Sequence, residues 1–156
     1  SWTPLPPLPT ARNHFATAAI DGKVYVVGGR FGGNVGSEMT AIVEVYDPAT
    51  NAWTEAAAMP TARAGINGVA SNRCLYIFGG EGNADDPAGV FDLAEVYDPT
   101  SDTWSSLQAM PTPVHGVNGA AVINGGIYLP GGGTERGGSS GSTGLQVFGV
   151  AGTCGL

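Results

Sequence analysis

Short apolar runs separated by turn-forming residues make up most of the chain, and no run has the period of an amphipathic helix. Residues 24–27 (Val-Tyr-Val-Val) and 75–78 (Leu-Tyr-Ile-Phe) are rich in β-branched and aromatic side chains, which favour strands. Turn-forming pairs lie between such runs at the spacing of β-hairpins. These pairs are Asp21-Gly22, Ser71-Asn72 and Asn124-Gly125. The pattern predicts an all-β protein of short antiparallel strands.

A repeat of about fifty residues organises these strands. Trp2, Trp53 and Trp104 are spaced by 51 residues each time. Gly-Gly pairs recur at 28–29, 79–80 and 131–132, and an aromatic residue recurs at 46, 97 and 148. In chain order we expect the Trp2 strand, then four strands, four strands and three strands, with the first strand of each unit at about 15–20, 66–70 and 120–123. We expect one domain over residues 1–156, with repeat units of approximately 1–53, 54–104 and 105–156.

Gly-Gly at the end of the second strand, a tyrosine in the third and a tryptophan in the fourth make each unit similar to the kelch repeat. The resemblance covers nearly the whole chain and implies a β-propeller, in which each repeat is a four-stranded blade around a central channel. A blade has two apolar faces, which it can bury only against neighbouring blades. We therefore expect an all-β, kelch-type β-propeller with three four-stranded blades per chain, half of a six-bladed ring.

Three blades do not close a ring, since kelch rings typically hold six or seven. The last unit lacks the Asp-Pro turn and the tryptophan of the others, and residues 1–4 supply what it lacks. Because the two ends of a half ring lie on opposite edges, we expect a homodimer in which the Trp2 strand closes the third blade of the partner. The alternative is a structural half-propeller fragment of a longer chain. Residue 1 is serine rather than methionine, so we expect a processed or excised chain.

Composition narrows the classes of function. The chain has 26 glycines, 11 prolines and a formal charge of −7, with six basic residues against thirteen acidic ones. A protein that binds nucleic acid needs an excess of basic residues, so we expect no nucleic-acid partner. No apolar run approaches the roughly 20 residues of a membrane span, so we expect no membrane contact. Cys74 and Cys154 lie at unlike repeat positions and are expected to be free thiols.

Arginines fall in the segments that should form one rim of the propeller. Arg12 and Arg63 precede the first strand, Arg30 follows Gly-Gly, and Arg136 lies in the third connection between second and third strands. In kelch proteins that capture acidic peptides, arginines at the first two kinds of position line the binding rim. The resemblance therefore implies a ligand role for Arg12, Arg30 and Arg63, since guanidinium groups bind carboxylates in a bidentate manner. Val114 departs from this pattern in the third unit.

A structural interpretation stands beside this one. Arg12 and Arg63 could pair with Glu44 and Glu95, which recur with the same repeat. Arg30 and Arg136 have no repeat-matched acidic partner, which favours a surface or ligand role for them. The same rim is not simply basic, because it also carries acidic residues. These are Glu81, Asp85, Asp86, Asp92 and Glu135.

His14 and His115 lie near the start of the first strand in units one and three. Two imidazoles fall short of the three or four ligands of a usual metal site, so we expect no metal and no cofactor. The candidate ligand-binding residues are Arg12, Arg30, Arg63, Arg136, His14 and His115.

The expected function is a binding or interaction module that presents the rim loops to a protein segment or a small acidic ligand. The alternative is a sugar-active, mutarotase-like propeller enzyme. A copper-radical oxidase is disfavoured because neither cysteine lies in a rim loop beside a tyrosine.

Overall fold

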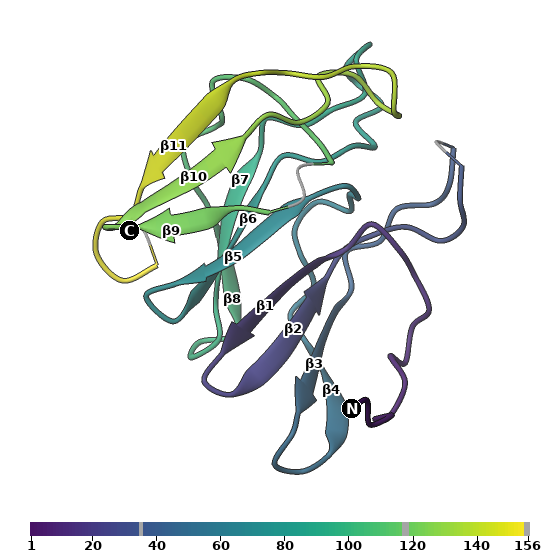
Figure 1. The fold of residues 1–156 in the computed structure, drawn as a ribbon, viewed down its shortest axis with the longest axis vertical. Coiled ribbons are helices and arrows are strands. Elements are labelled where there is room, and N and C mark those ends of the chain that lie inside the picture. The colour runs from purple at the N-terminus through teal and green to yellow at the C-terminus, as the bar shows by residue number, and fades with distance from the viewer. Residues whose placement is uncertain (35, 117–118, 155–156) are drawn as a thin grey trace.

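The computed structural model describes residues 1–34, 36–116 and 119–154. Over these residues the chain forms eleven strands in three antiparallel sheets and no helix (Figure 1). None of this part of the chain is therefore a helix that could cross a membrane.

The sheets are meanders in chain order, and successive sheets stack face to face. The first sheet comprises β1 (Ala16–Ile20), β2 (Lys23–Val27), β3 (Val43–Asp47) and β4 (Ala52–Ala56). The second comprises β5 (Asn67–Ser71), β6 (Cys74–Phe78), β7 (Ala94–Asp98) and β8 (Thr103–Ser106). The third comprises β9 (Ala121–Ile123), β10 (Gly126–Pro130) and β11 (Leu145–Gly149). The expected all-β blades are confirmed.

Among the residues that the structure describes, the third blade has three strands, and the residues around Trp2 form no strand. The N-terminal segment lies beside β4, whereas β11 lies at the other side of the molecule (Figure 1). A strand needs a neighbouring edge to hydrogen-bond with, and β11 is out of reach of residue 2 of the same chain. The two ends of the stack therefore differ: the N-terminal segment is hydrogen-bonded to the first blade at one end, and among the described residues β11 is an edge strand at the other.

Turns follow the expected chemistry with one shift. Asp47 Oδ1 accepts from the Ala49 N–H at 2.8 Å, which closes the turn between the third and fourth strands of the first blade. In the hairpin of the second blade the turn residues are Asn72 and Arg73, not Ser71 and Asn72, because Ser71 still pairs with Cys74 in the ladder. Arg73 accordingly adopts a left-handed conformation with φ of 64°.

The apolar core lies between the blades. One cluster joins the first and second sheets through residues such as Val27, Val43, Leu75 and Ile77, and another joins the second and third sheets. Gly79 has a φ of +59°, and a Cβ there would overlap the Val114 carbonyl oxygen of the next blade. The Gly-Gly pair therefore lets the backbones of neighbouring blades approach closely.

A disulfide joins Cys74, at the start of β6, to Cys154 in the tail, with the Cα atoms 5.4 Å apart. The expectation of two free thiols was wrong. Repeat positions did not indicate the pairing because the tail leaves the repeat after β11: the Val150 N–H donates to the Gly125 carbonyl, and Gly152 O accepts from the Asn72 side chain. The bond fastens the end of the third blade to the second.

Candidate functional site

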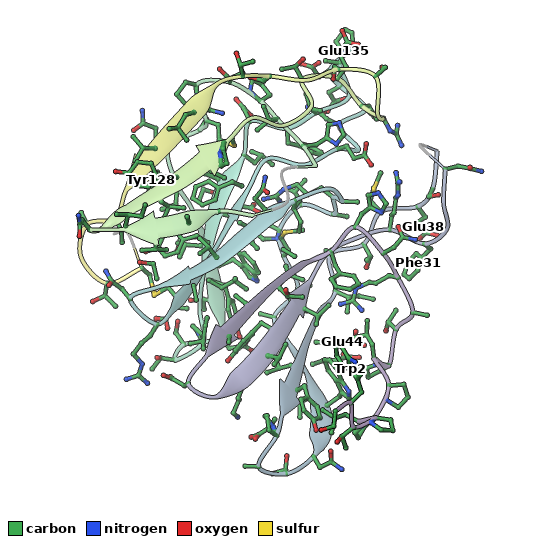
Figure 2. The ribbon with its side chains drawn as sticks, in the orientation of Figure 1. Trp2, Phe31, Glu38, Glu44, Tyr128 and Glu135 are labelled. Carbon is green, nitrogen blue, oxygen red and sulfur yellow. A yellow bond between two sulfur atoms is a disulfide. The ribbon has the colours of Figure 1, made fainter. Side chains whose placement is uncertain are left out.

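The rim of the stack is formed by the long connections between the second and third strands, together with the segments that precede each first strand. These connections lie at one end of the sheets, and the hairpin turns after β1, β5 and β9 lie at the other (Figure 1). Figure 2 shows Phe31, Glu38 and Glu135 at the end that carries the connections.

Arg63 lies just before β5 with its side chain fully buried. Its Nη1 donates to Glu95 Oε2 at 2.6 Å and to the Thr61 carbonyl at 3.2 Å, and its Nε donates to the Gly79 carbonyl at 2.8 Å. Burial lowers the pKa of the Arg63 guanidinium, and the Glu95 carboxylate opposes that shift. The group joins the start of the first strand to the second and third strands of the same blade.

Arg12 repeats this arrangement in the first blade. It pairs with Glu44, and it donates to the Gly28 carbonyl at 2.8 Å and to the Thr10 carbonyl at 2.9 Å. The pairing expected under the structural interpretation is thus confirmed for both arginines. Their guanidinium groups lie below the rim and are already hydrogen-bonded, so the structure does not place them on the ligand-facing surface that the resemblance implied.

The third blade replaces this ion pair with neutral residues. Val114 occupies the arginine position, and Gln146 occupies the position of Glu44 and Glu95. Gln146 Oε1 accepts from the Thr112 N–H at 3.0 Å, and Gln146 Nε2 donates to the Thr112 carbonyl at 3.0 Å. Because both members change together, no buried charge loses its partner in this blade.

Arg30 does have a repeat-matched acidic partner, contrary to expectation. Arg30 Nη1 donates to Glu81 Oε1 at 2.6 Å, and both side chains are buried. The two residues hold the same place after Gly-Gly in adjacent blades, so the propeller sets them side by side. Comparing one repeat position across neighbouring blades, rather than within one blade, would have found the pair.

The two histidines extend this pair across all three blades. His14 Nε2 accepts from Arg30 Nη2 at 3.0 Å, and His14 Nδ1 donates to Asn13 Oδ1 at 2.7 Å, so this imidazole is neutral. Desolvation and the charge of Arg30 lower the pKa of His14, which agrees with that protonation state. His115 Nδ1 lies 3.7 Å from Glu81 Oε2. We call the chain His14–Arg30–Glu81–His115 the rim network.

The rim network is anchored to the third connection. His115 Nε2 donates to the Glu135 carbonyl at 2.7 Å, and Glu81 Oε2 accepts from the Gly137 N–H at 3.2 Å. Arg136 lies between these two contacts, and the aliphatic part of its side chain would meet a Cβ at Gly89 of the second blade. Arg136 is half-buried rather than free at the rim.

Above this network the exposed charges on the rim are acidic. They are Glu38, Asp85, Asp86, Asp92 and Glu135. The structure therefore brings His14, His115 and Arg30 together, leaves Arg12 and Arg63 below them, and sets Arg136 at the third blade. Across the described ranges, no group of three or more His, Cys, Asp or Glu side chains is arranged to hold a metal ion.

Residues 1–136 match the family described as the KLHDC2/KLHL20/DRC7 Kelch-repeats domain. The chain is also 35% identical over 137 residues, 87% of its length, to Kelch-like protein terF of Aspergillus terreus. The chain belongs to the kelch-repeat family. The family identified from the repeat is thereby confirmed.

Other kelch proteins give the same result. The chain is 36% identical over 132 residues, 78% of its length, to Kelch-like protein 25 of Rattus norvegicus. It spans only 29% of terF and 20% of Kelch-like protein 25. The structure of YjhT overlays 86% of this kelch chain with a TM-score of 0.72 at 24% identity, and the match covers 49% of that protein. This likeness shows the propeller fold alone.

Proposed function

We propose that the chain is a kelch interaction module whose rim binds a segment of another protein. The observation that carries the proposal is the rim network, which ties three blades together at the base of the loops and holds them as one surface. The buried Arg30–Glu81 ion pair links the first two blades, and the hydrogen bond from the Gly137 N–H to Glu81 links the second blade to the third. Buried polar contacts of this kind hold neighbouring loops in one arrangement. The names of the relatives agree with this class of function, since both are Kelch-like proteins.

The contact residues we propose are His14, Arg136 and the exposed parts of the connections 30–34, 36–40, 81–92 and 133–144. Arg30 and His115 support them from below, because both side chains are buried in the rim network. Arg12 and Arg63 support the rim at a deeper level. A protein segment suits this rim better than a small acidic ligand, because Arg12, Arg30 and Arg63 each already pair with a carboxylate.

A displayed library of random peptides tests the rim. We expect enriched peptides that bind the wild-type chain and the Arg73→Ala variant equally, because Arg73 is exposed on the opposite end. The same peptides should lose at least about tenfold in affinity on a combined His14→Ala and Arg136→Ala variant. Peptides that bind all three proteins equally would overturn the assignment of these contacts.

We also propose that two chains form one six-bladed ring. The outward face of the third blade is apolar and bare: Leu145 is 65% and Val147 61% exposed. The equivalent residues of the second blade, Ala94 and Val96, are 3% and 1% exposed because the next blade covers them. Bare faces of this kind mark an interface. In Figure 2 Tyr128 lies on this outer sheet, far from the N-terminal segment with Trp2.

The first blade offers the complementary face. In the second blade, the residues that face the first blade and join the core between the two are Ile66, Leu75 and Tyr97. The residues at the equivalent positions of the first blade are Phe15, Val24 and Tyr46. The first blade of a second copy would therefore pack against the third blade with the same kinds of side chain that the second blade packs against the first within one chain. Such an isologous pair of junctions closes on a twofold axis.

The backbone supports the same closure. Between blades, the Gly29 N–H donates to the Arg63 carbonyl and the Gly80 N–H donates to the Val114 carbonyl, each at 3.0 Å. By the repeat, the next donor is Gly132 and the next acceptor is the Arg12 carbonyl of a second copy.

Solution mass tests the ring. We expect twice the 15.7 kDa of one chain by light scattering. A stable monomer would overturn the two-chain ring and leave as the alternative a single longer chain that supplies the other blades.

A further inference from the structure

A cavity of about 300 Å³ lies below the rim, where the first strands of the blades come together. The strands β1 and β5, which lie side by side, carry part of its wall (Figure 1). Residues 14–17 of the first blade and 65–68 of the second line it, together with Gly116 and Gly119 at the start of the third. Because His14 is exposed and belongs to the rim network, the cavity is continuous with the surface that we propose binds a protein segment.

The cavity is lined by uncharged groups. Among the described residues, its polar side chains are those of His14, Thr17 and Asn67, and the His14 imidazole is neutral. Phe15 and Ile66 supply apolar wall. The lining therefore suits a neutral group that has a polar end and an apolar stem.

The Asn67 side chain stands out in this lining because it is buried and unpaired. Asn67 is the first residue of β5 and is 1% exposed. Within the described part of the chain, neither its Oδ1 nor its Nδ2 has a hydrogen-bond partner. A buried amide in this state destabilises a fold. The first blade has Ala16 at the same position, also buried, so the blade itself does not require an amide there.

Asn67 faces the side of the cavity that the third blade lines. Side chains alternate along a strand, and Val69 packs in the core between the second and third blades, whereas Ile66 packs in the core shared with the first. Gly116 and Gly119 line the cavity on the third blade, and a Cβ at either would meet no atom within 4 Å. This open space leaves room for the Asn67 side chain to turn into the cavity. Rotamer changes of this kind are common on binding.

A primary carboxamide is the chemical complement of Asn67. The Asn67 side chain offers a carbonyl acceptor beside an NH₂ donor, and a second carboxamide offers the same two groups in the reverse order. The two can therefore pair through two parallel hydrogen bonds. A carboxylate has acceptors only, so it would leave Asn67 Oδ1 unpaired and would be buried among uncharged side chains. A single trans peptide group directs its N–H and C=O to opposite sides and reaches only one of the two atoms.

We propose that this cavity is a specificity pocket for a glutamine or asparagine side chain of the protein segment that the rim binds. The carboxamide of that side chain pairs with Asn67, and Phe15 and Ile66 contact its methylene groups. The inference rests on the proposed function and adds which kind of residue in the bound segment is selected.

The peptides enriched from the displayed library test the pocket. We expect them to share glutamine or asparagine at one position. Changing that residue to the acid of the same size should lower the affinity at least about tenfold, because a site built for a hydrogen-bonding group rejects a group that leaves it unpaired. An Asn67→Leu chain should no longer distinguish glutamine from leucine there. Val69→Ala is the control, since Val69 lies on the same face of β5 but outside the cavity, and it should keep the preference.

Thermal melting separates recognition from a structural role of the amide. Asn67→Leu replaces an unpaired buried amide with an apolar side chain of similar size, so the melting temperature should rise by about 2–4 °C. Asn67→Ala copies the first blade and serves as a second variant, which should lose the carboxamide preference without melting lower. A fall in melting temperature in both variants would show that the fold itself uses the amide, and would overturn the inference.

The pocket and the rim fail in different ways. Peptides that bind the wild-type chain with no preference for a carboxamide would overturn the pocket and leave the proposed function intact. If no peptide binds, the proposed function fails, and propionamide then tests the pocket by itself. At millimolar concentration propionamide should shift the Asn67 side-chain signals in a ¹⁵N NMR spectrum, and propionate should not. Signals that propionamide leaves unchanged would overturn the pocket as well.

Discussion

Replacing Glu95 with glutamine should destabilise the chain by about 3–5 kcal/mol, because it leaves the fully buried Arg63 guanidinium without a counter-charge. Arg63→Val alone should also be costly, because it leaves the buried Glu95 carboxylate unpaired. Losses of this size are a large share of the 5–15 kcal/mol typical of a domain.

The double variant decides whether the pair behaves as a unit. Arg63→Val with Glu95→Gln copies the third blade, where Val114 and Gln146 hold the same positions and the glutamine bonds both backbone groups of Thr112. We expect the double variant to be more stable than Glu95→Gln alone, with a coupling energy of at least about 2 kcal/mol.

Urea unfolding followed by circular dichroism measures all four proteins of the cycle, provided that the slope of the transition stays constant. If the loss of unfolding free energy in the double variant equals the sum of the losses in the two single variants, the reasoning is refuted. Such a result would show that replacing both charges together is no better than replacing each one alone.

Three further perturbations test other parts of the structure. Gly79→Ala should prevent folding or lower the free energy of unfolding by several kcal/mol, because the added Cβ would overlap the next blade. Gly22→Ala is the control, because Gly22 also has a positive φ but its Cβ would meet open space. Thermal melting should show that Gly22→Ala lowers the free energy of unfolding by only about 1 kcal/mol. Reduction of Cys74–Cys154 should lower stability by roughly 2–5 kcal/mol, measured as a shift in urea midpoint that a Cys74→Ser, Cys154→Ser chain does not show. The pKa of His14 is lowered in the folded chain, so the stability that its neutral form contributes is complete above pH 6.5 and is lost as the pH falls from there through the folded pKa. Between pH 7.5 and 5 the free energy of unfolding of the wild type should therefore fall slightly more than that of His14→Gln. The difference should be less than about 1 kcal/mol because the ring is exposed.

The repeat made most of the fold predictable. Tryptophan, Gly-Gly and tyrosine recur because each makes the same contact in successive blades. Their spacing therefore indicates the positions of the strands, the positions of the turns and the order of the strands in each blade. The first strands begin and end within about one residue of the expected positions, for example β5 at Asn67–Ser71 against 66–70. The sequence predicts the turn at Ser71 and Asn72, whereas the structure has it at Asn72 and Arg73, because arginine is not a residue type that usually adopts a left-handed conformation.

The candidate site was less accessible to sequence reasoning. The resemblance implies a ligand role for Arg12 and Arg63, yet their carboxylate partners are in the same blade, where the repeat also indicates them. The repeat does not directly indicate the pairing of Arg30 with Glu81, because the two residues lie in different blades. The disulfide joins a repeat position to a tail that has no repeat, so no spacing could indicate it.

The third blade departs from the repeat where its neighbour would come from another chain. After Gly-Gly the three blades carry Arg30, Glu81 and Gly133, and a Cβ at Gly133 would lie 2.6 Å from His115 Nε2. Glycine at this position therefore lets His115 reach the carbonyl of Glu135. In the proposed ring, Gly133 would stand next to Arg30 of the second copy, which already pairs with its own Glu81. An arginine at 133 would repel that group, and a glutamate would compete for it at a buried site. In the proposed ring, a neutral residue at this position avoids both effects.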